Sequence, residues 1–132
     1  NRKLIPKADY ILLLTFIAFF IFIGNMKNMP AISSLLSKMV TKRECIMGVV
    51  TSQFVSNVPA AVLLSGFSQN ISDLIIGTNL GGLGTLIASM ASLISYKYYV
   101  KTKDNNAGKY IIYFGILSII YLAILLSYYF IF

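Results

Sequence analysis

A cluster of polar side chains interrupts the longest uncharged stretch of this chain. Residues 45–72 contain no Lys, Arg, Asp or Glu, yet near their middle lie Ser52, Gln53, Ser56, Asn57 and Pro59. Hydroxyl and amide oxygens suit a hard monovalent cation such as Na⁺. Proline is favoured in the first turn of a helix, whose positive dipole end attracts an anion. The cluster therefore predicts a binding site for a cation and an anion.

A second interruption follows in the next uncharged stretch, residues 74–96. Four glycines fall within the eight residues 77–84, and each weakens a helix by roughly 1 kcal/mol. We expect a break over residues 77–85 and a half-helix over residues 85–96. Adjacent interrupted segments indicate a transporter site near the middle of a membrane. The candidate substrate- and ion-binding residues are Ser52, Ser56, Asn57, Val58, Pro59, Thr78, Asn79, Gly81, Gly82, Gly84 and Thr85.

Composition indicates an all-α membrane protein with a re-entrant helical hairpin and a broken helix. The chain is 58% hydrophobic and 11% charged, with a mean hydropathy of +0.80. The net charge of +7 comes from short loops between apolar stretches, so it does not indicate nucleic-acid binding. With no His and the single Cys45, a Cys–His catalytic pair and a cysteine metal motif are excluded, and we expect neither an enzyme nor a bound cofactor.

The lengths of the uncharged stretches decide how each is interpreted. Residues 10–26 and 110–132, of 17 and 23 residues, are read as plain spans. A single 28-residue helix over residues 45–72 would reach about 42 Å, longer than a ~30 Å hydrocarbon core. We therefore expect a hairpin that enters and leaves on one side, with Ser56 and Asn57 at its tip.

Six segments follow from this pattern. Residues 29–40 have apolar side chains at helical spacing and are too short to span, so they predict an amphipathic helix in the interface. The expected segments are a scaffold transmembrane helix (1–28), an interfacial helix (29–41), a re-entrant hairpin (42–68), a broken transmembrane helix (69–98), a cytoplasmic loop (99–109) and a C-terminal transmembrane helix (110–132).

Basic residues predict the orientation. Four lysines lie in the segment 97–109, which we expect in the cytoplasm, whereas the segment 65–73 has no basic residue and is expected outside. The hairpin would then enter from outside. Lys27, Lys38, Lys42 and Arg43 oppose this orientation, although an interfacial helix allows such side chains to reach headgroups.

The motif residues resemble a known group of transporters. SQFVSNVPAAVLL followed by GTNLGGLGTLIASMASLISYK is similar to the ion transporter superfamily of arsenite permeases, NhaD-type antiporters, citrate carriers and divalent-anion:sodium symporters. The resemblance covers residues 52–97. Within that superfamily these residues look most like those of bacterial anion permeases. In that family each of two inverted repeats supplies a hairpin and a broken helix. The dicarboxylate branch carries Ser-Asn-Thr at the tip, whereas Ser56-Asn57-Val58 here lacks the Thr hydroxyl and looks more like the arsenite and NhaD branch.

The resemblance implies a function and its partners. Ser52, Ser56 and Asn57 would bind Na⁺ and touch the substrate, and residues 79–85 would complete the site. The chain would be the C-terminal part of a multi-pass transporter of the inner or plasma membrane. Its partners would be a small inorganic or carboxylate anion, membrane lipid, the rest of the transporter chain and a second copy in a homodimer.

Coupling and activity leave alternatives open. No acidic residue lies within an apolar stretch, which favours Na⁺ over H⁺ as the coupling ion. The alternatives are an NhaD-like cation/proton antiporter and a membrane subunit that does not transport.

Overall fold

Helices make up all the regular structure that is described. The computed structural model describes residues 10–102 and 106–131, and within these ranges the predicted all-α fold is confirmed. In chain order the elements are α1 (Tyr10–Lys27), α2 (Pro30–Val40), α3 (Glu44–Val55), α4 (Asn57–Ser65), α5 (Ile71–Gly81), the 3₁₀ helix η2 (Leu86–Ala88), α6 (Met90–Tyr99) and α7 (Ala107–Ile131).

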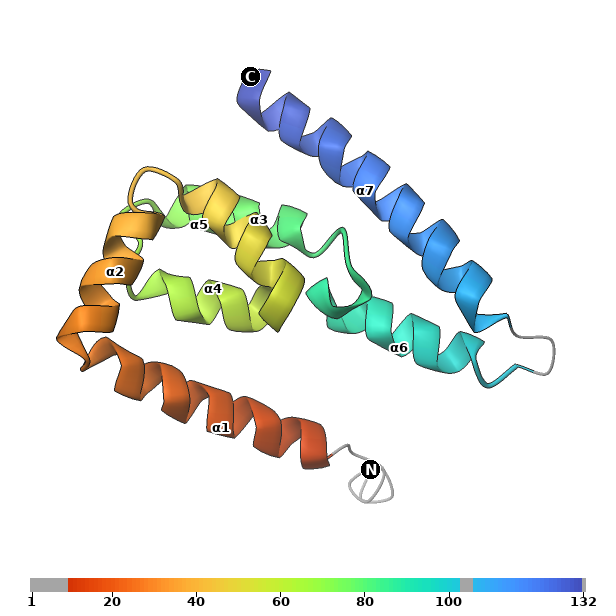
Figure 1. The fold of residues 1–132 in the computed structure, drawn as a ribbon, viewed down its shortest axis with the longest axis horizontal. Coiled ribbons are helices and arrows are strands. Elements are labelled where there is room, and N and C mark those ends of the chain that lie inside the picture. Colours follow the sequence, from red (N-terminus) through yellow and green to blue (C-terminus); the bar gives the residue numbers. More distant parts are fainter. Residues whose placement is uncertain (1–9, 103–105, 132) are drawn as a thin grey trace, which may run out of the picture.

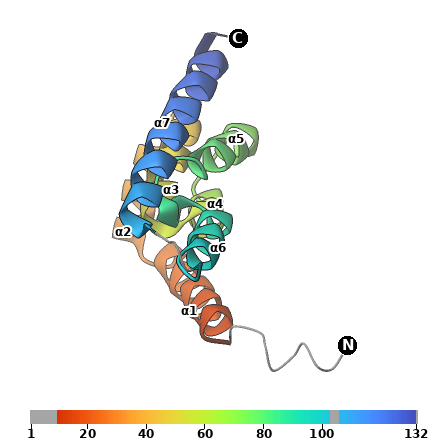
Figure 2. The same cartoon turned by 90° about the vertical axis from the view of Figure 1, so that its right-hand side faces the viewer.

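Three central helices carry the rest of the fold. Helices α3, α4 and α5 pack together, and α2 crosses one end of the group (Figure 1). Helices α1 and α7 extend at opposite sides of this group in both views (Figures 1 and 2). A buried cluster of Val40, Leu64, Phe67 and Leu74 joins α2, α4 and α5 at the end away from the interruptions. Apolar packing at that end holds the three helices together.

Helix α7 is long and apolar, and its side chains are largely exposed. Its 25 residues, at 1.5 Å each, reach about 37 Å, enough to cross a ~30 Å hydrocarbon core. Ile112, Ile119 and Ile131 are 61, 62 and 74% exposed. By length and composition α7 qualifies as a membrane span, whereas α1 and α2 qualify only as a pair, and that pair is bent by 97°.

Helix α2 agrees with the helical spacing seen in the sequence. Pro30 occupies the first turn, where its missing N–H costs no hydrogen bond. Val40 is fully buried and Leu36 packs against the core, but Leu35 and Met39 stay exposed. The apolar face of α2 is thus covered at one edge and open at the other.

A single residue separates α3 from α4. Continuing α3 through Pro59 would place its ring against the Val55 carbonyl and leave that carbonyl without an N–H partner. The chain instead turns at Ser56, whose φ of 72° and ψ of 153° lie in a region that only glycine normally occupies. Helix α4 then begins at Asn57, and Ala60 donates its N–H to the Ser56 carbonyl at 3.0 Å.

Small residues bring α3 and α5 into close contact. A Cβ added at Gly81 would lie 2.7 Å from the Ser52 Cβ, and one added at Gly77 would collide with the Cys45 backbone. One added at Gly48 would lie 2.9 Å from the Thr78 nitrogen. Glycines four residues apart on α5 therefore let the two backbones approach, as small residues do between membrane helices.

The predicted second break began too early. Residues 77–81 remain helical, because Gly77 and Gly81 form the contact surface of α5 instead of ending the helix. The interruption covers residues 82–85, where Gly84 has a φ of +116°. The expected half-helix from Thr85 was also misplaced, since the short 3₁₀ helix η2 and an extended Ser89 precede α6.

Candidate functional site

The two interruptions lie against one another. The tip of the α3–α4 hairpin faces the C-terminal end of α5, so residues far apart in the sequence meet there (Figure 1). A Cβ added at Gly82 would lie 3.2 Å from the Asn57 Nδ2. The structure thus brings Ser52, Ser56 and Asn57 to the same place as residues 81–85.

Ser52 is the most deeply buried of the candidate polar residues. It has no exposed surface, and its Oγ donates a hydrogen bond to the Gly48 carbonyl at 2.7 Å. Donating this proton leaves the lone pairs of the hydroxyl oxygen available to a ligand. Ser52 also packs directly against Gly81, so its oxygen lies at the α3–α5 contact.

Ser56 and Asn57 form the tip itself. Ser56 is 8% exposed, and its Oγ lies 3.5 Å from the Ala88 carbonyl oxygen, at the long limit of a hydrogen bond. The Asn57 Oδ1 accepts the N–H of Val58 at 2.9 Å, which turns its Nδ2 toward Gly82. Val58 is 49% exposed, while Pro59 is buried.

The remaining predicted residues divide into two groups. Thr78 is buried one helical turn before the end of α5, where its hydroxyl donates to the Leu74 carbonyl of the same helix at 3.0 Å. It packs against Gly48 of α3, so it lies in the α3–α5 contact and not at the tip. Asn79 is exposed on the same helix. Gly81, Gly82, Gly84 and Thr85 lie at the interruption beside the hairpin.

Gln53 is the site residue that the sequence prediction left out. Its Nε2 donates to the Gly81 carbonyl at 2.8 Å and contacts the Leu83 and Val49 carbonyls at 3.2 and 3.0 Å. Its Oε1 accepts the N–H of Thr85 at 2.9 Å. Gln53 belongs to the polar cluster visible in the sequence, but its partners at the α5–α6 interruption lie 28 to 32 residues away, so only the folded chain identifies them.

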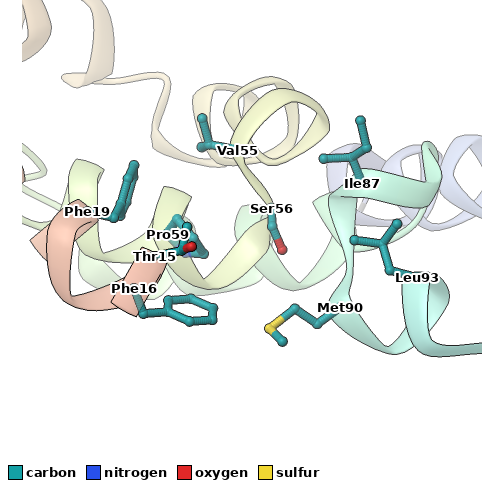
Figure 3. Close-up of a pocket in the computed structure, with 9 residues that line it drawn as sticks. All are labelled: Thr15, Phe16, Phe19, Val55, Ser56, Pro59, Ile87, Met90 and Leu93. Atoms are coloured by element: carbon teal, nitrogen blue, oxygen red, sulfur yellow. The ribbon is translucent and has the colours of Figure 1, made fainter. Parts of the chain in front are cut away.

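A cavity opens at the hairpin tip. It has a volume of about 310 Å³ and lies between α1, the hairpin and the η2–α6 segment (Figure 3). Its walls are apolar and are formed by Phe16, Phe19, Ile87, Met90 and Leu93. The Ser56 hydroxyl points into the space between Pro59 and Met90 (Figure 3). The cavity is therefore almost entirely apolar, and Ser56 is the polar side chain that the hairpin tip presents to it.

The helix ends give the site its electrostatic character. Helices α4 and α6 begin at this cavity, at Asn57 and Met90, and present their partial positive ends. Helices α3 and α5 end at Val55 and Gly81, and present partial negative ends beside them. Ends of both signs thus lie within one small region of the fold.

Curated relatives of this chain are membrane proteins. The chain is 38% identical over 122 residues to the uncharacterized transporter MJ0456 of Methanocaldococcus jannaschii, covering 92% of this chain and 34% of that protein. It is 31% identical over 99 residues to the inner membrane protein YbiR of Escherichia coli, covering 73% of this chain and 27% of that protein. The matched part of the chain therefore spans about a third of the first relative and about a quarter of the second. No family model and no solved structure matches it.

Proposed function

We propose that this chain forms part of a secondary active transporter that carries a small anion across the cell membrane, driven by Na⁺. Similarity to a transporter and to an inner membrane protein supports membrane transport as the general function. The observation that carries the finer proposal is the contact between Asn57 and Gly82, where the two interruptions meet. By sequence resemblance the transporter belongs with the anion permeases of the ion transporter superfamily.

The anion would bind in the cavity at the hairpin tip. The first turns of α4 and α6 border this cavity, and the positive dipole ends of these helices favour a negative charge. A volume of about 310 Å³ is enough for a small inorganic or carboxylate anion. Ser56 supplies a hydroxyl donor that points into the same space (Figure 3).

The Na⁺ ion would bind beside the anion, as a co-transported substrate. Ser52, Ser56 and Asn57 each carry a side-chain oxygen, and all three lie where α3 and α5 end. Oxygen ligands and the negative dipole ends of two helices favour a cation. A bound Na⁺ would in turn raise the affinity for the anion through its charge.

The α3–α4 hairpin would be re-entrant. At 1.5 Å per residue its arms of 12 and 9 residues reach about 18 and 14 Å, roughly half of a ~30 Å hydrocarbon core. The tip then lies near the middle of the membrane, where a non-helical backbone must be enclosed by protein or by a cavity. Contacts of the tip with α5 and the cavity meet this requirement.

The hairpin and broken helix would move against a scaffold formed by α1 and α7. Helix α2 joins α1 to the hairpin across a bend of 97°, so it would act as the lever between the two parts. This movement would expose the cavity first to one side of the membrane and then to the other.

Uptake into proteoliposomes tests the proposal. The full-length protein is assayed with radiolabelled phosphate, arsenite, citrate and succinate, with and without an inward Na⁺ gradient. We expect Na⁺-stimulated uptake of one anion that Ser56→Ala and Asn57→Ala abolish. Ser65→Ala and Asn28→Ala serve as controls, because they remove a hydroxyl and a carboxamide at exposed positions away from the tip.

Other outcomes would assign a different function. Cation flux driven by a pH gradient, without anion uptake, would identify a cation/proton antiporter. Absence of any flux together with recovery in a larger complex would identify a membrane subunit that does not transport.

A further inference from the structure

The side chain of Gln53 bonds to two backbone groups that the interruption leaves without their helical partners. In a continuous α-helix the Thr85 N–H would donate to the Gly81 carbonyl four residues earlier. Here the Gln53 amide lies between these two groups: its Nε2 donates to the Gly81 oxygen at 2.8 Å and its Oε1 accepts the Thr85 N–H at 2.9 Å. The amide thus replaces one broken backbone bond by two.

Backbone contacts reinforce this arrangement. The Thr85 hydroxyl donates to the Gln53 carbonyl oxygen at 3.1 Å, so the two residues bond through both side chain and main chain. Gly84 passes so close to Gln53 that an added Cβ would collide with the Gln53 Oε1. Glycine is needed at this point both for that approach and for its φ of +116°.

We propose that Gln53 is the positioning residue that holds the α5–α6 interruption open and fastens it to the hairpin. The two interruptions then move as one rigid unit and keep their helix ends at the binding site. The role in transport rests on the function proposed above, whereas the role in holding the interruption does not.

An amide is the group that this position requires. It offers N–H donors for carbonyl oxygens and an oxygen acceptor for an N–H, all on one planar group. Leucine offers neither. A protonated glutamic acid offers one donor and one acceptor, but its ionised form has no donor and would face the Gly81 and Leu83 carbonyl oxygens.

Hydrogen exchange at the Thr85 amide tests the positioning role without reference to transport. The full-length protein in lipid nanodiscs, free of substrate and Na⁺, is compared with each variant at the same pH. Gln53→Leu is expected to speed exchange at Thr85 by about 10-fold or more, because its acceptor is lost. Gln69→Leu, an exposed glutamine in the loop before α5, is the matched control and should leave the rate unchanged.

A glutamic acid at this position makes the same test reversible. Gln53→Glu should exchange at the wild-type rate at about pH 5 and faster at about pH 8, because burial raises a carboxyl pKa above its usual value of about 4.3. Tyr96 of α6 is the one titratable side chain among the described residues that line the cavity beside Gln53. Tyr96→Phe in the Gln53→Glu background should keep the pH dependence, and Gln69→Glu should show none.

Both readouts bear on the proposal. A wild-type exchange rate at Thr85 in Gln53→Leu, or a rate in Gln53→Glu that is the same multiple of wild type at both pH values, would overturn it. The low-pH form of Gln53→Glu serves as the folded reference if Gln53→Leu fails to fold. Anion uptake by Gln53→Glu, relative to wild type, should fall as the pH rises from about 5 to about 8. A wild-type protein without uptake would refute the transport function but leave the exchange result decisive.

Discussion

Thr85 donates two hydrogen bonds to Gln53 across the contact between the hairpin and the broken helix. The Thr85 N–H donates to the Gln53 side chain at 2.9 Å, and the Thr85 hydroxyl donates to the Gln53 main chain at 3.1 Å. Breaks in apolar segments are costly because their polar backbone groups lose partners. This pair supplies partners at the break and at the same time joins it to the other interrupted segment.

The close contact of α3 with α5 should not tolerate a larger residue. Gly81→Ala places a Cβ 2.7 Å from the Ser52 Cβ, and such overpacking costs about 1–3 kcal/mol of unfolding free energy. Chemical unfolding in detergent measures the loss. Gly24→Ala is the matched control, because a Cβ there meets nothing within 4 Å, and it should be neutral or stabilising. Equal stability of the two variants would contradict the packing described here.

Backbone strain at the hairpin tip should separate stability from transport. Ser56→Gly relieves a φ of 72° and a ψ of 153°, a conformation that costs a non-glycine residue about 1–3 kcal/mol, so its thermal unfolding midpoint should rise. Uptake should fall, since the hydroxyl is lost. Lys42→Gly relieves a φ of 64° outside the site and should raise stability with uptake intact. Full uptake by the Ser56→Gly variant would show that the Ser56 hydroxyl is not part of the binding site.

Ser52 and Thr78 should differ in their effect on Na⁺ dependence. Both are buried hydroxyls that donate to a helix carbonyl one turn before a helix ends, but Ser52 packs against Gly81 beside the interruption, whereas Thr78 packs against Gly48. Ser52→Ala should raise the Na⁺ concentration for half-maximal uptake by about 10-fold or more, the worth of one ligand to a charged group. Thr78→Val should leave it unchanged. Similar shifts in the two variants would indicate a general loss of packing.

Cysteine labelling should reveal the path of the hairpin. In a Cys45→Ser background, Arg43→Cys and Gln69→Cys mark exposed positions at the outer ends of α3 and α4. An impermeant maleimide added outside the cell should label both, whereas Lys101→Cys should react only after permeabilisation. Labelling of Arg43→Cys and Gln69→Cys from opposite sides would make the hairpin a full span and contradict the re-entrant arrangement.

The sequence determined where the first interruption falls. A proline in the middle of an apolar stretch removes an N–H and clashes with the carbonyl four residues earlier. These effects are local, so Ser56 and Asn57 could be placed at a tip without knowledge of the fold. Helical periodicity located α2 for the same reason, since spacing within one element is written in its own residues.

Only the tertiary structure decided what the glycines do. Counting glycines predicted a break from residue 77, but Gly77 and Gly81 are helical because α3 packs against them, and packing outweighs a propensity of about 1 kcal/mol per residue. The break itself forms hydrogen bonds with the Gln53 side chain, which lies 28 to 32 residues earlier in the chain. A hydrogen bond over that separation depends on how α3 and α5 align, and no local pattern records that alignment.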